Sequence, residues 1–302
     1  MRRVVRGLSG KQKLFLTDFT ELKGCGCKVP KAELLGYLSA IPGTRSRVFS
    51  TSPDCHVEHP APGVTMASTV DFFFPLVDEA YLQGQIAAAN VMSDLFAMGI
   101  TRITSFLVTL GLSTSLTEEQ RGFVAGELLR GIENKVEEAG AVVGGGQTVR
   151  NPWVLVGGCA MGFLQPGEKL LDNRSAVPGD RLILTKPLGA QLAVNFAQVF
   201  RRDPEKTRKL LDTGKITLES FEKSFRKATD AMSRLNLGAA RTIQKHQSWV
   251  RGSTDVTGFG LKGHSDNLVE LQQSPVDFVF EKVPVFEGLK DLDGVVRDFR
   301  LR

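Results

Sequence analysis

The stretch that decides the fold is STVDFFFPLVDEAYLQGQIAAANVMSDLFAMGI, residues 68–100. Val64–Phe74 has the apolar, β-branched and aromatic composition of a strand, which Pro75 ends. The segment Glu79–Met98 then predicts a long helix that Gly99 stops. Because this helix is apolar or small on nearly all of its faces, we expect it to be buried. A strand followed by a buried helix predicts a sheet with helices packed on it.

Further strands and a helix follow this unit along the chain. Ile103–Leu112 and Trp153–Leu164 have strand composition. The helix between them begins at Thr117, where Gln120 can complete a capping box, and ends at Gly140. These elements predict an α+β domain.

A second domain is expected after a polar, turn-rich boundary at residues 165–180. A chain of 302 residues also favours about two domains. We predict an N-terminal domain at 1–172 and a C-terminal α+β domain at 173–302. The latter would contain a strand at RLILTK (Arg181–Lys186), charged helices over Pro204–Gln247 and a strand at VDFVF, and is therefore short of strands.

The composition is that of a globular protein, with 42% hydrophobic and 24% charged residues. Apolar stretches are far shorter than the ~20 residues of a membrane span, and the first residues contain no secretion signal. We therefore expect a soluble, cytoplasmic protein without a membrane partner. The net charge of +5 is concentrated in arginines near the two ends, so we expect no nucleic-acid partner. These arginines are Arg2, Arg3, Arg6, Arg297, Arg300 and Arg302.

Four aspartates lie at positions that are typical of a site for a metal ion and phosphate. Asp71 interrupts the apolar strand, Asp94 lies one turn after Asn90 on the buried helix, and Asp54 and Asp255 lie in loops of small residues. Carboxylates on short loops and helix faces, beside many glycines, suit Mg²⁺ with phosphate ligands. However, a loop aspartate is commonly a turn residue, and a buried one commonly caps a helix or pairs with an arginine. The residues alone leave these interpretations open.

Two glycine-rich motifs have different interpretations. GGGQT (Gly144–Thr148) follows the strand-like AVV, and its backbone N–H groups and the Thr148 hydroxyl can bind a phosphate; a tight turn between strands is the alternative. Gly258–Gly263 matches the dinucleotide fingerprint GxGxxG, but no buried strand is expected before it. We therefore exclude a nicotinamide site. The chain also has no GxSxG and no HExxH, which excludes common hydrolases.

The cysteine cluster GCGCK suggests chemistry rather than a disulfide. Cys25 and Cys27 are one residue apart, which strains a mutual disulfide. A thiol beside Lys28 can be held as thiolate and act as a nucleophile or bind a soft substrate. A zinc site is the alternative, with the ligands Cys25, Cys27, Cys55 and either His59 or His56.

Six motifs, in this order, resemble those of selenophosphate synthetases (selenide, water dikinases). The resemblance runs from Leu16 to Leu268. The motifs are FTELKGCGCKVP, STVDFFFPLVD, IAAANVMSDLFAMGI, GGGQTVRNPW, AVPGDRLILTKPLG and STDVTGFGLKGH. The resemblance implies the two-domain α+β fold of aminoimidazole ribonucleotide synthetase, with an N-terminal domain that binds ATP and dimerises through its sheet. It also implies transfer of the γ-phosphoryl group of ATP to selenide, giving selenophosphate, AMP and orthophosphate, with Mg²⁺ and a potassium-type cation.

The resemblance also implies roles for individual residues. Cys25 matches the position where active members carry cysteine or selenocysteine, and Lys28 matches an essential lysine of the same loop, which also contacts ATP. Asp54, Asp94 and Asp255 match metal-binding aspartates. Asp71 and Asn90 match nucleotide and metal contacts. Asp94 belongs to both groups. The phosphate-binding glycine loop of the family, which can act across the dimer interface, corresponds to Gly145, Gly146, Gln147 and Thr148.

One departure from the family leaves two alternatives open. Family members continue beyond the point that matches Arg302, so we expect an incomplete second domain with an exposed sheet edge. The chain would then be a non-catalytic dimerising or regulatory homologue, or it would phosphorylate another small acceptor. The presence of Cys25, Lys28 and the aspartates favours the enzyme.

Overall fold

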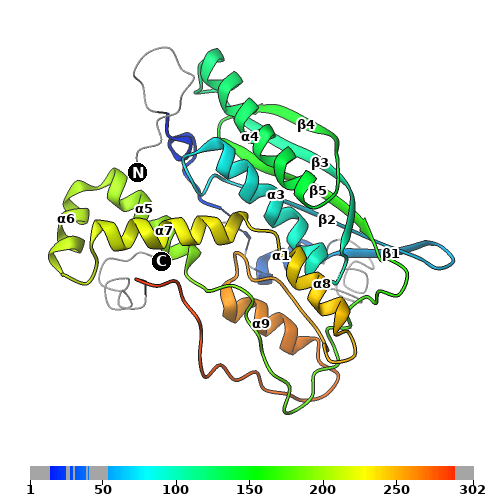
Figure 1. The fold of residues 1–302 in the computed structure, drawn as a ribbon. Helices are drawn as coiled ribbons and strands as arrows, with labels where there is room; N and C mark the ends of the chain where they lie inside the picture. The colour runs from blue at the N-terminus through cyan, green and yellow to red at the C-terminus, as the bar shows by residue number, and fades with distance from the viewer. Residues whose placement is uncertain (1–13, 25–27, 30, 39, 41–53, 290–302) are drawn as a thin grey trace. The chain divides into compact units, whose positions relative to one another are not determined.

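The computed structural model describes residues 14–24, 28, 29, 31–38, 40 and 54–289 (Figure 1). The chain forms two compact units. The larger unit combines residues 5–180 with Leu235–Phe278, and the smaller combines Arg181–Arg234 with the segment that begins at Val279. Both units mix sequence from distant parts of the chain.

The larger unit is built on a five-stranded sheet with the strand order β1-β2-β5-β3-β4. Only β3 and β4 are parallel, and the other neighbouring pairs are antiparallel. The strands are β1 (His56–Ala61), β2 (Val64–Phe73), β3 (Arg102–Ser113), β4 (Val143–Asn151) and β5 (Leu155–Phe163). The strand predictions at 64–74, 103–112 and 153–164 are confirmed to within two residues at each end.

Two long helices, α3 (Ala80–Ala97) and α4 (Glu118–Glu138), pack against each other beside this sheet (Figure 1). The predicted burial of α3 is confirmed, since most of its residues are inaccessible to solvent. The predicted capping box at the start of α4 also forms, because the Gln120 backbone N–H donates to Thr117 Oγ1 and the Thr117 N–H donates to Gln120 Oε1. A Cβ atom added at Gly131 would lie 2.0 Å from the carbonyl oxygen of Tyr81, so glycine permits the close approach of the helices.

The described part of the larger unit also contains four shorter helices. They are the 3₁₀ helix η1 (Leu16–Phe19), α1 (Lys31–Leu38), α8 (Leu237–Lys245) and α9 (Gly260–Glu270). Segment 235–278 joins this unit through contacts such as that of Asn236 Nδ2, which donates to Ser93 Oγ at 2.9 Å. The compact units thus divide the chain differently from the predicted domains 1–172 and 173–302. These domain boundaries stay a prediction.

The smaller unit consists of helices around an apolar core. Its helices are α5 (Ala190–Arg202), α6 (Pro204–Asp212) and α7 (Leu218–Ser233). Pro204 occupies the first turn of α6, as predicted, and Asp203 Oδ1 accepts a hydrogen bond from the Lys206 backbone N–H. The buried core includes Ala193, Phe196, Leu210, Ile216, Phe221, Ala228, Ala231, Phe286 and Leu289.

Two strand predictions in the second half are wrong. RLILTK (181–186) and VDFVF (276–280) form no strand, and Leu188 and Val285 make only an isolated parallel bridge. Ile183 is 80% exposed and Val279 is 71% exposed. Apolar, β-branched composition forms a strand only where a neighbouring strand completes the hydrogen bonds, and these segments have none among the described residues. Within the ranges that the structure describes, no helix is long and apolar enough to cross a membrane.

Candidate active site

Three carboxylates converge in the larger unit, although they are far apart in sequence. Asp54 lies just before β1, Asp94 lies on α3, and Asp255 lies in the irregular segment 251–259 that leads into α9. One carboxylate oxygen of each lies within 4.8 Å of those of the other two. Among the described residues this is the only such group of acidic, histidine or cysteine side chains. These are the three aspartates that the resemblance matched to metal ligands.

Two threonine hydroxyls orient this cluster. Thr69 Oγ1, on β2, donates to Asp94 Oδ2 at 2.7 Å. Thr254 Oγ1 donates to Asp54 Oδ1 at 3.2 Å. Neither threonine was predicted. Alternation along a strand places Thr69 on the same face as Asp71, two residues later, and this was the available signal for it.

The electrostatics of the cluster favour a bound cation. Burial, and then repulsion from Asp255, raise the pKa of Asp54 to about 7, while the Thr254 hydrogen bond and Lys28 oppose the rise. Burial, Asp255 and Asp71 raise the pKa of Asp94 well above its ordinary range. A cation would remove both the desolvation cost and the repulsion. An all-carboxylate set of ligands is typical of a hard ion such as Mg²⁺, so these residues fit the metal that the family implies.

Asp71 links the cluster to Lys28. Asp71 lies inside β2, with Gly158 of β5 opposite, and its Oδ2 accepts a hydrogen bond from Asn90 Nδ2 at 2.9 Å. Lys28 Nζ lies 3.5 Å from Asp71 Oδ1. Burial raises the pKa of Asp71, whereas Lys28 and Asn90 lower it. The structure therefore brings together Asp71, Asn90 and Lys28, which the sequence had indicated as nucleotide contacts.

The Lys28 ammonium also lies over the ring of Phe259, 5.7 Å from its centroid. The Phe259 ring in turn packs against His264 with 5.6 Å between the centroids. The Lys28 side chain is 37% exposed, so the cation stays accessible to a ligand. Neither Phe259 nor His264 was predicted as a site residue; both lie in the quoted STDVTGFGLKGH motif.

The predicted cysteine chemistry lies mostly outside the described residues. Cys25 and Cys27 both lie outside the described residues, so the nucleophile and the zinc alternative stay predictions. Cys55 is described, and burial, followed by repulsion from Asp94, raises the pKa of its thiol. This environment disfavours the thiolate that zinc ligation requires. His59 Nδ1 is instead 3.1 Å from Thr65 Oγ1 on the β1–β2 hairpin.

Gly144–Thr148 form part of a strand and not a loop or a turn, whereas their contact with a phosphate stays a prediction. All five residues lie in β4, beside β3, with their side chains or Cα atoms exposed. Gly146 has φ +149°, and a Cβ atom there would lie 2.0 Å from the carbonyl oxygen of Val108. The glycines thus allow close strand pairing rather than a turn. Because β5 and β3 separate β4 from β2, the stretch lies about 14 Å across the sheet from Asp71, and one chain does not bring the two together.

The expectation that no strand precedes the GxGxxG match is confirmed by the structure. Residues 251–257, which precede the GxGxxG match, contain no strand, and α9 begins at Gly260. The motif therefore lacks the strand-turn-helix context that binds a pyrophosphate.

Two family models match successive parts of the chain. The model described as AIR synthase related protein, N-terminal domain, matches residues 52–164, and the corresponding C-terminal domain model matches 177–296. A protein named "Probable selenide, water dikinase" from Caenorhabditis elegans is 38% identical, with 97% of this chain and 79% of that protein covered. "Selenide, water dikinase" from Dictyostelium discoideum is 44% identical, with 92% and 73% covered.

Solved structures share the fold at low sequence identity. Thiamine monophosphate kinase from Aquifex aeolicus superposes with a TM-score of 0.63 at 16% identity, covering 89% of this chain and 82% of that chain. The hydrogenase maturation protein HypE of E. coli superposes with a TM-score of 0.54 at 15% identity, covering 90% and 78%. Together with the family models, these structures confirm the predicted two-domain α+β fold related to aminoimidazole ribonucleotide synthetase.

Proposed function

We propose that this chain, which belongs to the selenide, water dikinase family, converts ATP, selenide and water to selenophosphate, AMP and orthophosphate. The observation that carries the proposal is the convergence of Asp54, Asp94 and Asp255 within 4.8 Å of one another. Phosphoryl transfer from ATP depends chiefly on positioning and on neutralising the anionic phosphates. A buried group of carboxylates beside a lysine supplies the residues for both tasks.

Asp54, Asp94 and Asp255 would hold Mg²⁺, with Asp71 as a further ligand. The metal supplies neutralisation of the phosphate charge. The hydroxyl of Thr69 fixes the Asp94 carboxylate in one orientation before any ligand arrives. Because the ligands are oriented in advance, little reorganisation is needed when the nucleotide binds.

Lys28 would stabilise the oxygens of the transferring phosphoryl group. Its ammonium lies 3.5 Å from Asp71 Oδ1 and 5.7 Å from the centroid of the Phe259 ring, and these two contacts define its position. Asn90 holds the other oxygen of Asp71, which prevents that carboxylate from turning away from Lys28. Lys28 also contacts ATP in this proposal. Cys25, three residues earlier, is the catalytic thiol by its match to the family.

The proposal includes a homodimer formed through the open face of the sheet. Val70 and Phe72 of β2 are 62% and 58% exposed, and β4 is exposed over nearly its whole length. Large apolar side chains in such a patch are typical of an interface. Within a dimer, Gly145, Gly146, Gln147 and Thr148 would contact the nucleotide of the partner's site. A potassium-type cation, a cytoplasmic location and the absence of nucleic-acid or membrane partners belong to the same proposal.

A turnover assay tests this function. Purified chain is incubated anaerobically with ATP, Mg²⁺ and selenide, and phosphorus NMR follows AMP and selenophosphate. We expect selenide-dependent formation of both products, and loss of both in Cys25→Ala and Asp94→Asn. Asp172→Asn is the matched control, because that exposed carboxylate pairs with Arg174 and lies outside the cluster.

The same assay separates two other functions. The non-catalytic homologue is favoured by the absence of strands from the smaller unit among the described residues. ATP binding without selenophosphate or AMP would support it. AMP or ADP formed without selenide, on addition of another small nucleophile, would instead support a kinase with a different acceptor.

A further inference from the structure

Asp255 lies in a segment with no regular structure, although its carboxylate must be placed accurately. Residues 251–257 form neither helix nor strand, yet Asp255 is only 9% exposed. Such a segment lacks the regular backbone hydrogen bonds of a helix or a strand. Two buried side chains from elsewhere in the larger unit supply these bonds, one on each side of Asp255.

Asn173 holds the segment two residues before Asp255. Its side chain is buried, with 5% exposure, and Nδ2 donates to the Ser253 carbonyl oxygen at 2.8 Å. Its Oδ1 accepts from the Ser253 backbone N–H, also at 2.8 Å. One amide thus satisfies both backbone groups of one residue, as a neighbouring strand would. A Cβ atom added at Gly252 would lie 3.0 Å from Asn173 Oδ1, so the contact is tightly packed.

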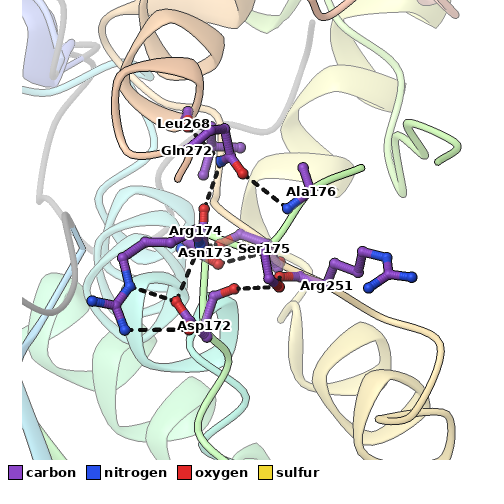
Figure 2. A network of polar contacts seen from close by, with 9 residues as sticks. Asp172, Asn173, Arg174, Ser175, Ala176, Arg251, Leu268 and Gln272 are labelled. Carbon is purple, nitrogen blue, oxygen red and sulfur yellow. Dashed lines mark hydrogen bonds and ion pairs between the residues drawn. The ribbon is translucent and has the colours of Figure 1, made fainter. Parts of the chain in front are cut away.

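Asn173 is itself held by Gln272, which lies just after the end of α9. Gln272 Nε2 donates to the Asn173 carbonyl oxygen at 2.7 Å and to the Leu268 carbonyl oxygen at 2.6 Å. Gln272 Oε1 accepts from the Ala176 backbone N–H at 2.9 Å, and Figure 2 shows these contacts together. The backbone around Asn173 is therefore tied at two points to Gln272, whose side chain also contacts α9. The side-chain amide of Asn173 therefore has little freedom to move if segment 251–257 shifts.

His264 holds the segment two residues after Asp255. It lies on α9, is 6% exposed, and its Nε2 accepts from the Thr257 backbone N–H at 3.1 Å. This bond requires an unprotonated Nε2. Phe259 packs against the same imidazole ring, so the contact also places the residue over which Lys28 lies.

We propose that Asn173 and His264 are positioning residues that fix the Asp255 carboxylate for metal binding, through Ser253 on one side and Thr257 on the other. This inference rests on the proposed function, because it assumes that the carboxylate cluster binds a divalent ion. Neighbouring hydrogen-bonded groups that orient metal ligands typically change metal affinity 10- to 100-fold when removed. Neither residue has a hydrogen bond to the three carboxylates. Each acts through the backbone of the segment that contains Asp255.

The test measures Mn²⁺ binding to the full chain without nucleotide, from the electron paramagnetic resonance signal of the free ion. We expect Asn173→Ala and His264→Leu each to raise the dissociation constant about 10- to 100-fold. His264→Gln keeps an acceptor near Nε2 and should bind Mn²⁺ more tightly than His264→Leu. Arg174→Ala and Lys262→Ala remove exposed ion pairs beside Asn173 and on α9, and should leave binding unchanged.

A second readout separates positioning from a general structural role. In turnover assays, saturating Mg²⁺ should restore most of kcat in both variants while the Mg²⁺ concentration for half activity stays raised. Circular dichroism melting without metal identifies any variant that does not fold. Asn173→Asp then replaces Asn173→Ala, since it keeps the acceptor for Ser253 N–H and loses the donor, with a negative charge added.

The outcomes are distinguishable. If the wild type binds Mn²⁺ and Asp255→Asn weakens it, but folded Asn173 and His264 variants bind as the wild type does, the inference is wrong and the proposed function stands. If Asp255→Asn leaves wild-type binding unchanged, or the wild type binds no Mn²⁺, the metal site itself is wrong, and the inference falls with it.

Discussion

Replacing Asp54 by asparagine should stabilise the metal-free protein at alkaline pH. Burial and Asp255 raise the pKa of Asp54 from 3.8 to about 7. In the folded protein the carboxylate therefore holds its proton up to a higher pH than in the unfolded chain. Between about pH 4 and pH 7 the folded state binds more protons, so the free energy of unfolding falls as pH rises. Above pH 7 the ionised Asp54 is a fixed destabilising charge.

The pKa difference sets the size of this effect. A rise from 3.8 to about 7 corresponds to an upper limit of about 4 kcal/mol, at ~1.4 kcal/mol for each pH unit. Asparagine removes the charge and keeps an oxygen that accepts the hydrogen bond from Thr254. For a unit of this size, each kcal/mol shifts the melting temperature by about 2–4 °C. We therefore expect Asp54→Asn to melt several degrees higher than the wild type at pH 8.

The assay is thermal unfolding by circular dichroism with EDTA, at pH 5 and pH 8. The gain of Asp54→Asn should be large at pH 8 and small at pH 5, and Mg²⁺ should stabilise the wild type more than the variant. Asp172→Asn is the control, because Arg174 lowers the pKa of that exposed carboxyl and its loss should bring no gain. An Asp54→Asn protein that is less stable than the wild type at pH 8 in EDTA would refute the electrostatic reasoning.

Three further predictions concern the lysine, the helix pair and the sheet face. Lys28→Met should lower kcat by about 10²–10³-fold with a smaller effect on ATP affinity, measured by titration calorimetry, because an electrostatic contact to the transferring group is lost. Gly131→Ala should destabilise the protein by about 1–3 kcal/mol in urea unfolding, because its Cβ meets the backbone of α3, whereas Gly126→Ala, with nothing within 4 Å, should be neutral or stabilising. Phe72→Asp should convert a dimer to a monomer in sedimentation velocity, and a wild-type chain that sediments as a monomer would contradict the interface itself.

The sequence predicted the elements whose signals are local. The helix α4 has its capping box in four consecutive residues, and α3 has its apolar faces and its terminal Gly99. Whether a segment forms a strand depends on a neighbouring strand, which the local sequence does not show. Gly144–Thr148 was interpreted as a loop because consecutive glycines usually mark turns, yet Gly146 pairs closely with β3. RLILTK has strand composition but no partner strand among the described residues.

The site was predictable only in part. Asp54, Asp94 and Asp255 were identified through whole motifs, since no local spacing joins residues about 40 and 160 positions apart. The groups that orient them were missed because their role exists only in three dimensions. Asn173 lies 80 positions from Ser253, and an isolated asparagine in a polar, turn-rich segment is usually a turn residue. His264 carries no signal of its own beyond its place in the last motif.

The hydrogen bonds around the aspartates hold these carboxylates close together, although the metal-free protein would be more stable with them apart. Burial and mutual repulsion disfavour ionised Asp54 and Asp94, and a free protein would gain by separating them or by turning one out to solvent. The hydrogen bonds from Thr69 and Thr254 hold two of the carboxylates in place. The backbone bonds of Asn173 and His264 keep the segment of the third from relaxing. In our proposal, a divalent ion bound by these carboxylates would recover the stability that burial and repulsion cost, so the same contacts that weaken the metal-free fold would strengthen its affinity for the ion.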